Sequence, residues 1–368
     1  MRNSKIYGLI LIPVFCLFLQ GSAQKRQYRM KKPVDTVGFA IKASQMDSVI
    51  KRINRIQGLE KANALKSANI DDKTPWKAVI CPHDDYTYVG WLYPAVLQNV
   101  KANTIIFFGV AHKAKQFKVE NYIVFDTFDK WAEPYGPMSV STLRNEIIDA
   151  LPKSIYIIHD SLQQAEHSVE AIIPFLQYSN RNIRIISILV PYMPFNRMDE
   201  ISTPLSETLV KVMKKHHLEW GKDVAIVIST DAVHYGDLDW GGQNYAPYGC
   251  DNDGFTKAKY LESEIINNCL TGDIRTKKIK SFIGYTLKED DYKSYKWTWC
   301  GRYSVPFGLL TAMKMQELFA KGEPLKGTLI GYSTSISGIP LPVSDIGMGK
   351  TAIATLHHWV GYCGIGYR

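Results

Sequence analysis

Short apolar segments rich in β-branched residues alternate with longer segments of helical periodicity along most of this chain. The short segments predict strands at residues 78–81, 104–108, 155–158, 183–190, 224–229, 328–332 and 351–355. The longer segments predict helices at residues 45–56, 89–100, 166–178, 202–217, 253–268 and 304–319. Because the strand segments are apolar at consecutive positions, we expect an α/β fold whose mainly parallel central sheet is buried on both faces and flanked by helices.

No linker or low-complexity segment interrupts this pattern, so residues 37–368 are predicted to form a single domain. Pro174 lies inside one predicted helix and is expected to bend it. Residues 244–250 are rich in glycine, proline and tyrosine, which predicts a loop.

The N-terminus follows a different pattern. Arg2 and Lys5 precede an almost wholly apolar segment at residues 6–19, and small residues follow at Gly21 and Ala23. This is typical of a signal peptide, so we expect residues 1–23 to be removed and the mature chain to be exported to the periplasm or the extracellular space. A transmembrane anchor is the alternative, but the apolar segment is short for a hydrocarbon core of about 30 Å. Residues 24–36 are predicted to form a basic, solvated tail.

Composition excludes few classes of protein. The chain has a formal net charge of +9 and is 46% hydrophobic, which is ordinary for a globular domain. It shows no alternation of basic and aromatic residues of the kind found in nucleic-acid-binding modules, and no second apolar segment that would cross a membrane. An odd number of cysteines follows the leader, so at least one thiol stays unpaired within the chain: Cys81, Cys250, Cys269, Cys300 and Cys363.

Polar residues follow three of the predicted strands directly. His83 follows the first, His112 the second, and Asp231 and His234 follow the strand at residues 224–229. Because the carboxyl ends of parallel strands meet at one edge of a sheet, we expect these side chains to converge there. The segments 166–170 and 299–302 can approach the same crevice, while His357 and His358 have no evident partner.

Imidazole, thiolate and carboxylate are the groups that bind transition metals in proteins. Two histidines and one cysteine would leave an open coordination position, as in catalytic sites. Each residue also fits a structural role when taken alone. A histidine after a strand can be a solvated surface residue, Cys300 can be a packing residue, and Asp231 can cap a turn. The repetition at three strand ends is what favours a metal site.

Five ordered motifs make the chain similar to the Memo-like family, also described as AmmeMemoRadiSam system protein B. A Pro-His-x-x-Tyr-x-Tyr-x-Gly motif contributes Pro82, His83, Tyr86, Tyr88 and Gly90. The second motif contributes Gly109 and His112, and the third, Glu-His-Ser-hydrophobic-Glu, is present whole at residues 166–170 as Glu166, His167, Ser168, Val169 and Glu170. The fourth contributes Ser229, Asp231, His234 and Gly236. The fifth contributes Cys300, Gly301 and Arg302. The order and approximate spacing agree from about residue 37 to residue 355.

The resemblance implies a fold similar to that of class III extradiol (LigB-like) dioxygenases. It implies one transition-metal ion, Fe or Cu ahead of Zn, held by His83, His112 and Cys300. It also implies that Asp231 and His234 line the same pocket and that Glu166 and His167 lie close by. The chain departs from the family pattern in two places, since Asp84 and Asp85 replace an Ala-Gly pair and Lys113 replaces a second histidine.

These observations favour an exported, metal-dependent oxidoreductase of the dioxygenase type. The metal ligands would be His83, His112 and Cys300. His234 would act as general acid or base with Asp231 orienting it, and His167 and Glu166 complete the candidate catalytic set. Two alternatives remain: a non-catalytic protein that sequesters metal or binds a peptide with the same pocket, and a hydrolase with Zn in the same site. The substrate, small molecule or peptide, is not specified by the sequence.

Overall fold

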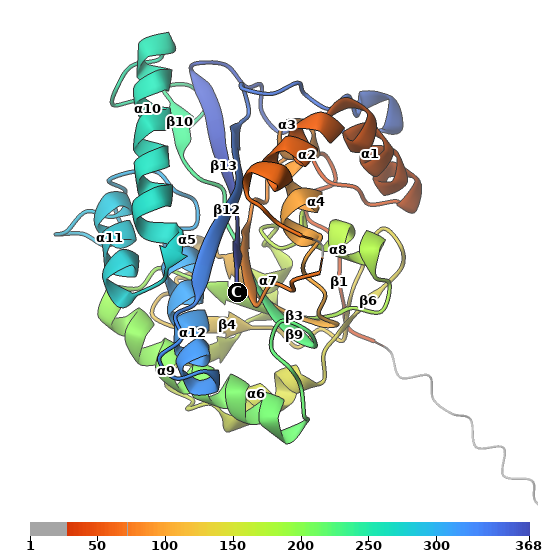
Figure 1. Cartoon of the computed structure of the whole chain (residues 1–368), viewed down its shortest axis with the longest axis vertical. Coiled ribbons are helices and arrows are strands. Elements are labelled where there is room, and N and C mark those ends of the chain that lie inside the picture. Colours follow the sequence, from red (N-terminus) through yellow and green to blue (C-terminus); the bar gives the residue numbers. More distant parts are fainter. Residues whose placement is uncertain (1–27, 72) are drawn as a thin grey trace, which may run out of the picture.

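One large mixed sheet runs through the molecule and carries helices on both of its sides (Figure 1). The computed structural model describes residues 28–71 and 73–368. Along the main path of the sheet the strands follow the order β1 (Met30–Lys31), β5 (Lys130–Trp131), β6 (Met138–Val140), β8 (Arg184–Val190), β3 (Thr104–Val110), β9 (Val224–Ser229), β2 (Ala78–Cys81), β13 (His358–Tyr367), β12 (Lys326–Thr334) and β11 (Gly272–Asp273). Off this path, β10 (His234–Gly236) pairs with β13, and β4 (Ile123–Phe125) pairs with β7 (Tyr156–Ile158) and β8.

The centre of the sheet is parallel and buried on both faces, which confirms the predicted fold class. Strands β8, β3, β9 and β2 pair in parallel with one another, in that order. Alternate residues of β3 enter different hydrophobic cores, with Ile106 and Phe108 in one and Ile105 and Phe107 in the other. Such a strand must be apolar at every position, and this is why the sequence shows continuous rather than alternating apolar segments.

The helices divide between the two faces (Figure 1). One core contains residues of α6 (Leu143–Ala150), α9 (Phe195–Lys215), α10 (Asn252–Ile265), α11 (Thr276–Thr286) and α12 (Ser304–Phe319), and the other contains residues of α1 (Ala43–Ile56), α4 (Leu92–Leu97) and α8 (Ile173–Ser179). The remaining helical segments are α2 (Gly58–Ser67), α3 (Tyr86–Val89), α5 (Ala114–Phe117), α7 (Asp160–Gln164), the π-helix η1 (Ile266–Leu270) and the 3₁₀ turn η2 (Ser344–Ile346).

The last strand differs from the prediction. Residues 351–355 do not form a strand, and β13 instead begins at His358 and lies between β2 and β12. Its apolar pattern is broken by glycines that the packing requires. A Cβ on Gly364 would lie 2.1 Å from Val96, and one on Gly366 would lie 2.3 Å from Trp76. The glycines therefore let a helix and an indole pack directly on the backbone of β13.

Two predicted helices also differ. The segment predicted at residues 166–178 is helical only from Ile173, so Pro174 lies in the first turn of α8 and does not bend a helix. Proline is tolerated there because the first amide groups of a helix have no intrahelical acceptor. The segment predicted at residues 89–100 is interrupted around Gly90, which separates α3 from α4.

One residue of the predicted basic tail, Lys31, is buried in the fold, whereas most of the other described residues between 28 and 36 are exposed. Met30 and Lys31 form β1, which pairs with β5. Lys31 is 1% exposed, forms an ion pair with Glu170 and places its Nζ atom 4.6 Å from the ring centre of Trp131. A buried lysine requires such a partner. The predicted signal peptide and residues 24–27 lie outside the described residues.

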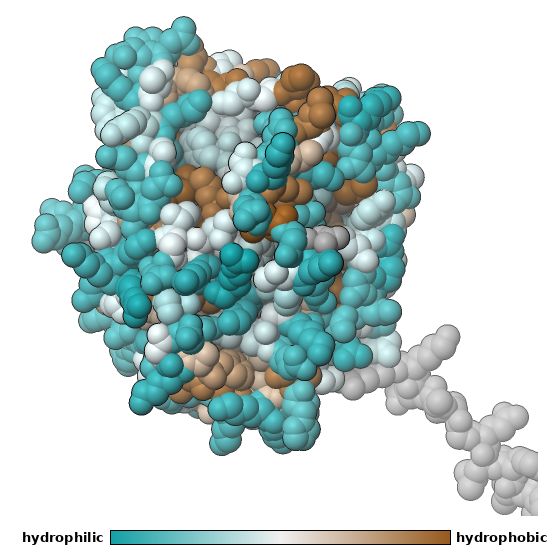
Figure 2. All heavy atoms as spheres, viewed as in Figure 1, coloured by the Kyte–Doolittle hydropathy of each residue, from teal (hydrophilic) through white to brown (hydrophobic). Residues whose placement is uncertain are grey.

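The surface shown in Figure 2 is mostly hydrophilic, and hydrophobic side chains are gathered in separate patches. Within residues 28–71 and 73–368, no helix is both long enough and apolar enough to span a bilayer. All five cysteines of the described residues are free thiols in this structure.

Candidate metal centre

The parallel strands bring their polar C-terminal residues together, as the sequence pattern predicts. His83 follows β2, His112 follows β3 and Asp231 follows β9. Strand β9 lies between the other two and pairs in parallel with both. Cys300 reaches the same place from a turn just before α12. It is held there because Trp299 forms an antiparallel bridge with Val233, which belongs to the segment after β9.

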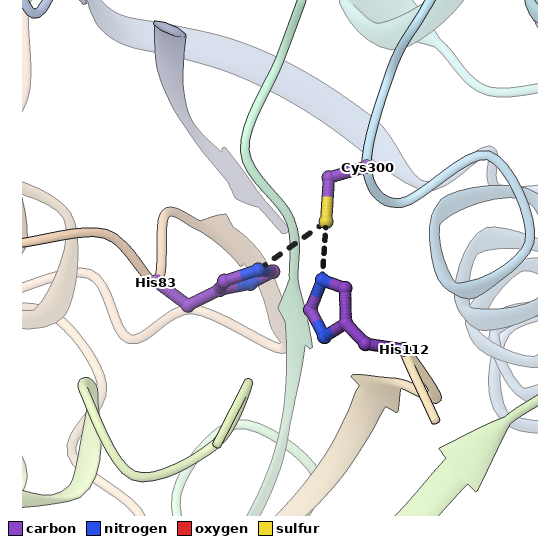
Figure 3. A group of neighbouring side chains, drawn as sticks. All are labelled: His83, His112 and Cys300. Atoms are coloured by element: carbon purple, nitrogen blue, oxygen red, sulfur yellow. Dashed lines mark hydrogen bonds between the residues drawn. The ribbon is translucent and has the colours of Figure 1, made fainter. Parts of the chain in front are cut away.

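Three candidate ligands point toward one another (Figure 3). The Sγ atom of Cys300 lies 2.9 Å from Nε2 of His112 and 3.3 Å from Nε2 of His83. His83 and Cys300 are almost wholly buried, while the His112 side chain is 28% exposed. The three side chains form one group whose donor atoms all lie within 4.8 Å of one another.

The tautomer of His83 suits a metal ligand. Its Nδ1 atom lies 2.7 Å from Oγ of Ser229, and the Ser229 hydroxyl donates its only proton to the carbonyl of Ser168. The Ser229 oxygen must therefore accept a hydrogen bond from Nδ1–H of His83. Nε2 then carries the lone pair, and it is the atom that faces Cys300.

A carboxylate holds His112 in the same way, with Nδ1 hydrogen-bonded and Nε2 facing Cys300. Its Nδ1 atom lies 2.8 Å from Oε1 of Glu166, and its backbone N–H donates to Oε2 of the same residue. Although burial opposes the shift, His112, His167 and the Ser168 amide lower the pKa of Glu166 to about 2. An ionised carboxylate on Nδ1–H fixes the ring and leaves Nε2 free, as metal-bound histidines in proteins commonly require.

These three residues fit a transition-metal ion. Two imidazoles and a thiol are donors that Zn, Cu and Fe accept, and both Nε2 atoms face the sulfur. The residue pattern also matches a family model. Residues 50–341 match the model of the Memo-like protein family. The chain belongs to the Memo-like family.

Several curated relatives of this Memo-like protein are archaeal. It is 26% identical to a MEMO1 family protein of Pyrococcus abyssi over 265 residues, which cover 70% of this chain and 80% of the relative. It is 25% identical to a MEMO1 family protein of Thermococcus kodakarensis over 268 residues, with the same shares covered. With one from Methanosarcina barkeri the identity is 29% over 158 residues, 42% of this chain and 54% of the relative.

The other predicted site residues lie beside the ligands of the Memo-like site. His167 stacks on His112 with ring centres 4.8 Å apart, and burial lowers the pKa of His167 to about 4. Donor atoms of Asp231 and His234 lie within 4.8 Å of the Cys300 sulfur and of each other. The seven residues predicted as metal ligands or catalytic residues are therefore close together. Arg302, from the same motif as Cys300, instead lies over the ring of Tyr295.

Asp231 does not orient His234 as we expected. Its Oδ1 atom accepts the backbone N–H of His83 at 2.9 Å. Its Oδ2 atom lies 4.0 Å from Nε2 of His234, which is too long for a hydrogen bond. Nε2 of His234 is buried and has no hydrogen-bond partner, and burial lowers the pKa of His234 to about 3. The imidazole of His234 is thus neutral and places an unpartnered nitrogen beside the three candidate ligands.

A cavity of about 350 Å³ opens in front of these residues. Its walls include side chains that the sequence analysis missed, namely Asp35, Phe39, Trp240, His358 and Tyr362. His358 stacks on Trp240 with ring centres 4.0 Å apart, so it does have a partner. Nothing in the spacing of residues 240 and 358 signals this contact, because it joins a loop to the start of β13.

The two aspartates that depart from the family pattern line the same cavity but lie outside the ligand group. Asp84 accepts a hydrogen bond from the Tyr362 hydroxyl at 2.5 Å. Asp85 accepts hydrogen bonds from the amide and the hydroxyl of Thr351, at 2.5 and 3.1 Å. Asp85 therefore ties the segment before β13 to the segment that follows β2. Neither carboxylate belongs to the group of His83, His112 and Cys300.

Glu262 of α10 joins the two segments that carry His234 and Cys300. It is wholly buried, and its Oε1 atom accepts the indole N–H groups of Trp297 and Trp299, both at 2.6 Å. Its Oε2 atom accepts the backbone N–H of Val233 at 3.1 Å. One carboxylate thus satisfies three donors from two segments that are more than 60 residues apart.

Replacement of Glu262 with glutamine is expected to loosen this connection. The new amide group would face either an indole N–H or the Val233 N–H, and two opposed donors leave a buried group unsatisfied at a cost of about 1–3 kcal/mol. We expect a lower midpoint in urea unfolding and about a 10-fold loss of metal affinity, as for other partners of ligand residues. Glu264→Gln on the same helix is the control, and equal effects of the two variants would contradict this role.

Proposed function

We propose that this Memo-like protein is an exported, metal-dependent oxidoreductase of the dioxygenase type, with Fe or Cu as its metal. The observation that carries the proposal is the convergence of His83 Nε2, His112 Nε2 and Cys300 Sγ. Both imidazoles are fixed by hydrogen bonds at Nδ1, and the buried Nε2 atom of His234 beside them has no partner. The resemblance to LigB-like dioxygenases supports the reaction class.

The residues of the pocket would have distinct roles. His83, His112 and Cys300 would hold the ion, which would supply one-electron chemistry with dioxygen and substrate. His234 would accept or return a substrate proton at Nε2, since no other group competes for that atom. The rings of Phe39, Tyr88 and Trp240 line the cavity and would exclude water from one face of a planar substrate.

Oxygen uptake tests this proposal. The protein is loaded anaerobically with Fe(II) or Cu(I), and oxygen consumption is followed with catechol-type substrates. We expect steady uptake that falls about 10²- to 10⁴-fold in His234→Ala, because a positioned acid–base group contributes that much. The exposed His216, which contacts only Glu146 among the charged groups described, provides the control variant His216→Ala.

Other outcomes would identify the alternatives. Stoichiometric metal with no uptake for either ion would contradict the oxidoreductase and favour a protein that sequesters metal or binds a peptide. Zinc as the only ion retained, together with ester or amide hydrolysis, would favour the hydrolase.

Export is the second part of the proposal, and it rests on the basic and apolar pattern of residues 1–23. N-terminal sequencing of the protein isolated from its native cells is expected to begin at Gln24. Detection of Met1 or of the apolar segment in the mature protein would contradict cleavage.

A further inference from the structure

A second group of metal-binding side chains lies outside the pocket. Asp237 follows β10, His357 precedes β13, and Cys250 precedes α10. These residues are distant in the sequence, yet one donor atom from each lies within 4.8 Å of the other two. The group shares no residue with the candidate metal centre.

The backbone holds two of these residues together before any ligand is present. Strands β10 and β13 pair in an antiparallel manner, with Gly236 opposite His358. Gly236 has a φ of +135°, and a Cβ at this position would lie 1.9 Å from the carbonyl oxygen of His357. The backbone N–H of Asp237 donates to that same carbonyl at 3.0 Å. Only glycine at position 236 allows Asp237 and His357 to come this close.

Cys250 is fixed by the start of α10. The next residue, Asp251, caps this helix by accepting the backbone N–H of Gly254 at 2.7 Å. The carbonyl of the preceding Gly249 accepts the hydroxyl of Tyr235 in β10 at 3.0 Å. The thiol of Cys250 hydrogen-bonds to Asp237. The third side chain is therefore anchored to the same pair of strands as the other two.

The three side chains already contact one another. Nδ1 of His357 lies 2.7 Å from Oδ1 of Asp237. The side chains of His357 and Asp237 are 52% and 37% exposed, so an ion can enter from solvent and keep water as a further ligand. One imidazole, one thiol and one carboxylate form a donor set of the kind that divalent zinc-like ions prefer.

We propose that Asp237, Cys250 and His357 form a second metal site, which takes a divalent ion of the zinc class. On binding, the Cys250 thiol loses its proton to solvent and its sulfur bonds to the ion. The hydrogen bond between His357 and Asp237 opens, and the imidazole proton moves through solvent from Nδ1 to Nε2, so that Nδ1 and a carboxylate oxygen also bond to the ion. Bond lengths of about 2.0–2.3 Å in a tetrahedral arrangement require Nδ1 of His357 and Oδ1 of Asp237, which are 2.7 Å apart, to separate to about 3.3 Å.

An ion bound at the second site would also fix part of the wall of the cavity beside the candidate metal centre. The segment between Asp237 and Cys250 carries Trp240, and His358 directly follows His357. Trp240 stacks on His358 at 4.0 Å, and its ring centre lies 5.1 Å from that of His234. An ion at the second site would hold both ends of the loop against β13. It would thereby fix the wall that Trp240 and His358 form beside His234.

Cobalt titration tests the second site. Full-length protein with His83→Ala and Cys300→Ser lacks two of the three candidate ligands of the first site, and Co²⁺ is the probe. We expect one equivalent of Co²⁺ to bind with a sulfur-to-cobalt charge-transfer band and to release about one proton in weakly buffered solution. Adding Cys250→Ser should abolish the band, and adding His357→Ala should weaken binding at least 10-fold.

A matched control separates this site from general surface binding. His216 forms the same kind of contact, with Nε2 2.7 Å from Oε2 of Glu146, but it belongs to no group with a cysteine. His216→Ala should leave the cobalt spectrum unchanged. A band that persists without Cys250, or the absence of any band, would overturn the proposal. If the background variant does not fold, native mass spectrometry of zinc-loaded wild type and Cys250→Ser decides, since equal zinc counts would also overturn it.

Discussion

Replacing Cys300 with serine is expected to lower the affinity of the pocket for Fe(II) or Cu(I) by more than about 100-fold. Loss of a residue that only supports a ligand costs about 10- to 100-fold in affinity, and loss of the ligand itself removes a direct bond. In this protein the sulfur is the atom on which both Nε2 atoms converge. The dissociation constant is measured by competition with a chelator of known affinity, and the bound metal by elemental analysis.

The control for this variant is another buried cysteine. Cys269 is wholly buried in the hydrophobic core, and it belongs to none of the metal-binding groups found among the described residues. Cys269→Ala should keep its metal even if it is less stable. Unchanged metal content in both Cys300→Ser and His83→Ala would show that the three residues do not hold the ion.

Replacing Lys31 with alanine is expected to lower the free energy of unfolding by about 3–5 kcal/mol at pH 8, because it leaves Glu170 buried without its cation. Burial already raises the pKa of Glu170, and Lys31 opposes this shift. Without Lys31 the pKa of folded Glu170 rises further. The loss of stability is therefore smallest below the pKa of the unfolded chain and grows as the pH rises through the folded value.

Urea unfolding at pH 5 and pH 8 measures this difference. Lys32 is exposed, so Lys32→Ala should change the free energy of unfolding by less than about 0.5 kcal/mol at both pH values. A loss in Lys31→Ala that does not depend on pH, or that equals the loss in Lys32→Ala, would contradict the role of the buried ion pair.

The ligand histidines could be found from the sequence because they follow apolar strands. A continuous apolar segment fixes the strand, and the strand places the next residue at the edge of the sheet. Cys300 has no such signal, since it lies in a turn that contacts between distant residues hold in place, among them the bridge between Val233 and Trp299. Only the resemblance to a family indicated it before the structure did.

Predictions from the local sequence pattern were wrong where contacts between residues distant in the sequence decide the conformation. Residues 166–172 have helical periodicity, but the carboxylate of Glu166 accepts the backbone N–H groups of His167 and Ser168. The same carboxylate oxygen lies 2.8 Å from Nδ1 of His112, so a contact with a distant strand end holds Glu166 in place. Lys31 looked like part of a solvated tail because its partner, Glu170, follows 139 residues later.

The position of β13 sets the order of events during biosynthesis. This strand ends at Tyr367 and fills the place between β2 and β12, next to the strand that leads into His83. Until the ribosome has added β13, β2 lacks one of its two neighbours and Tyr362 cannot reach Asp84. The centre that contains His83 can therefore take its final form only after β13 has been synthesised, and an ion can enter that form only from then on.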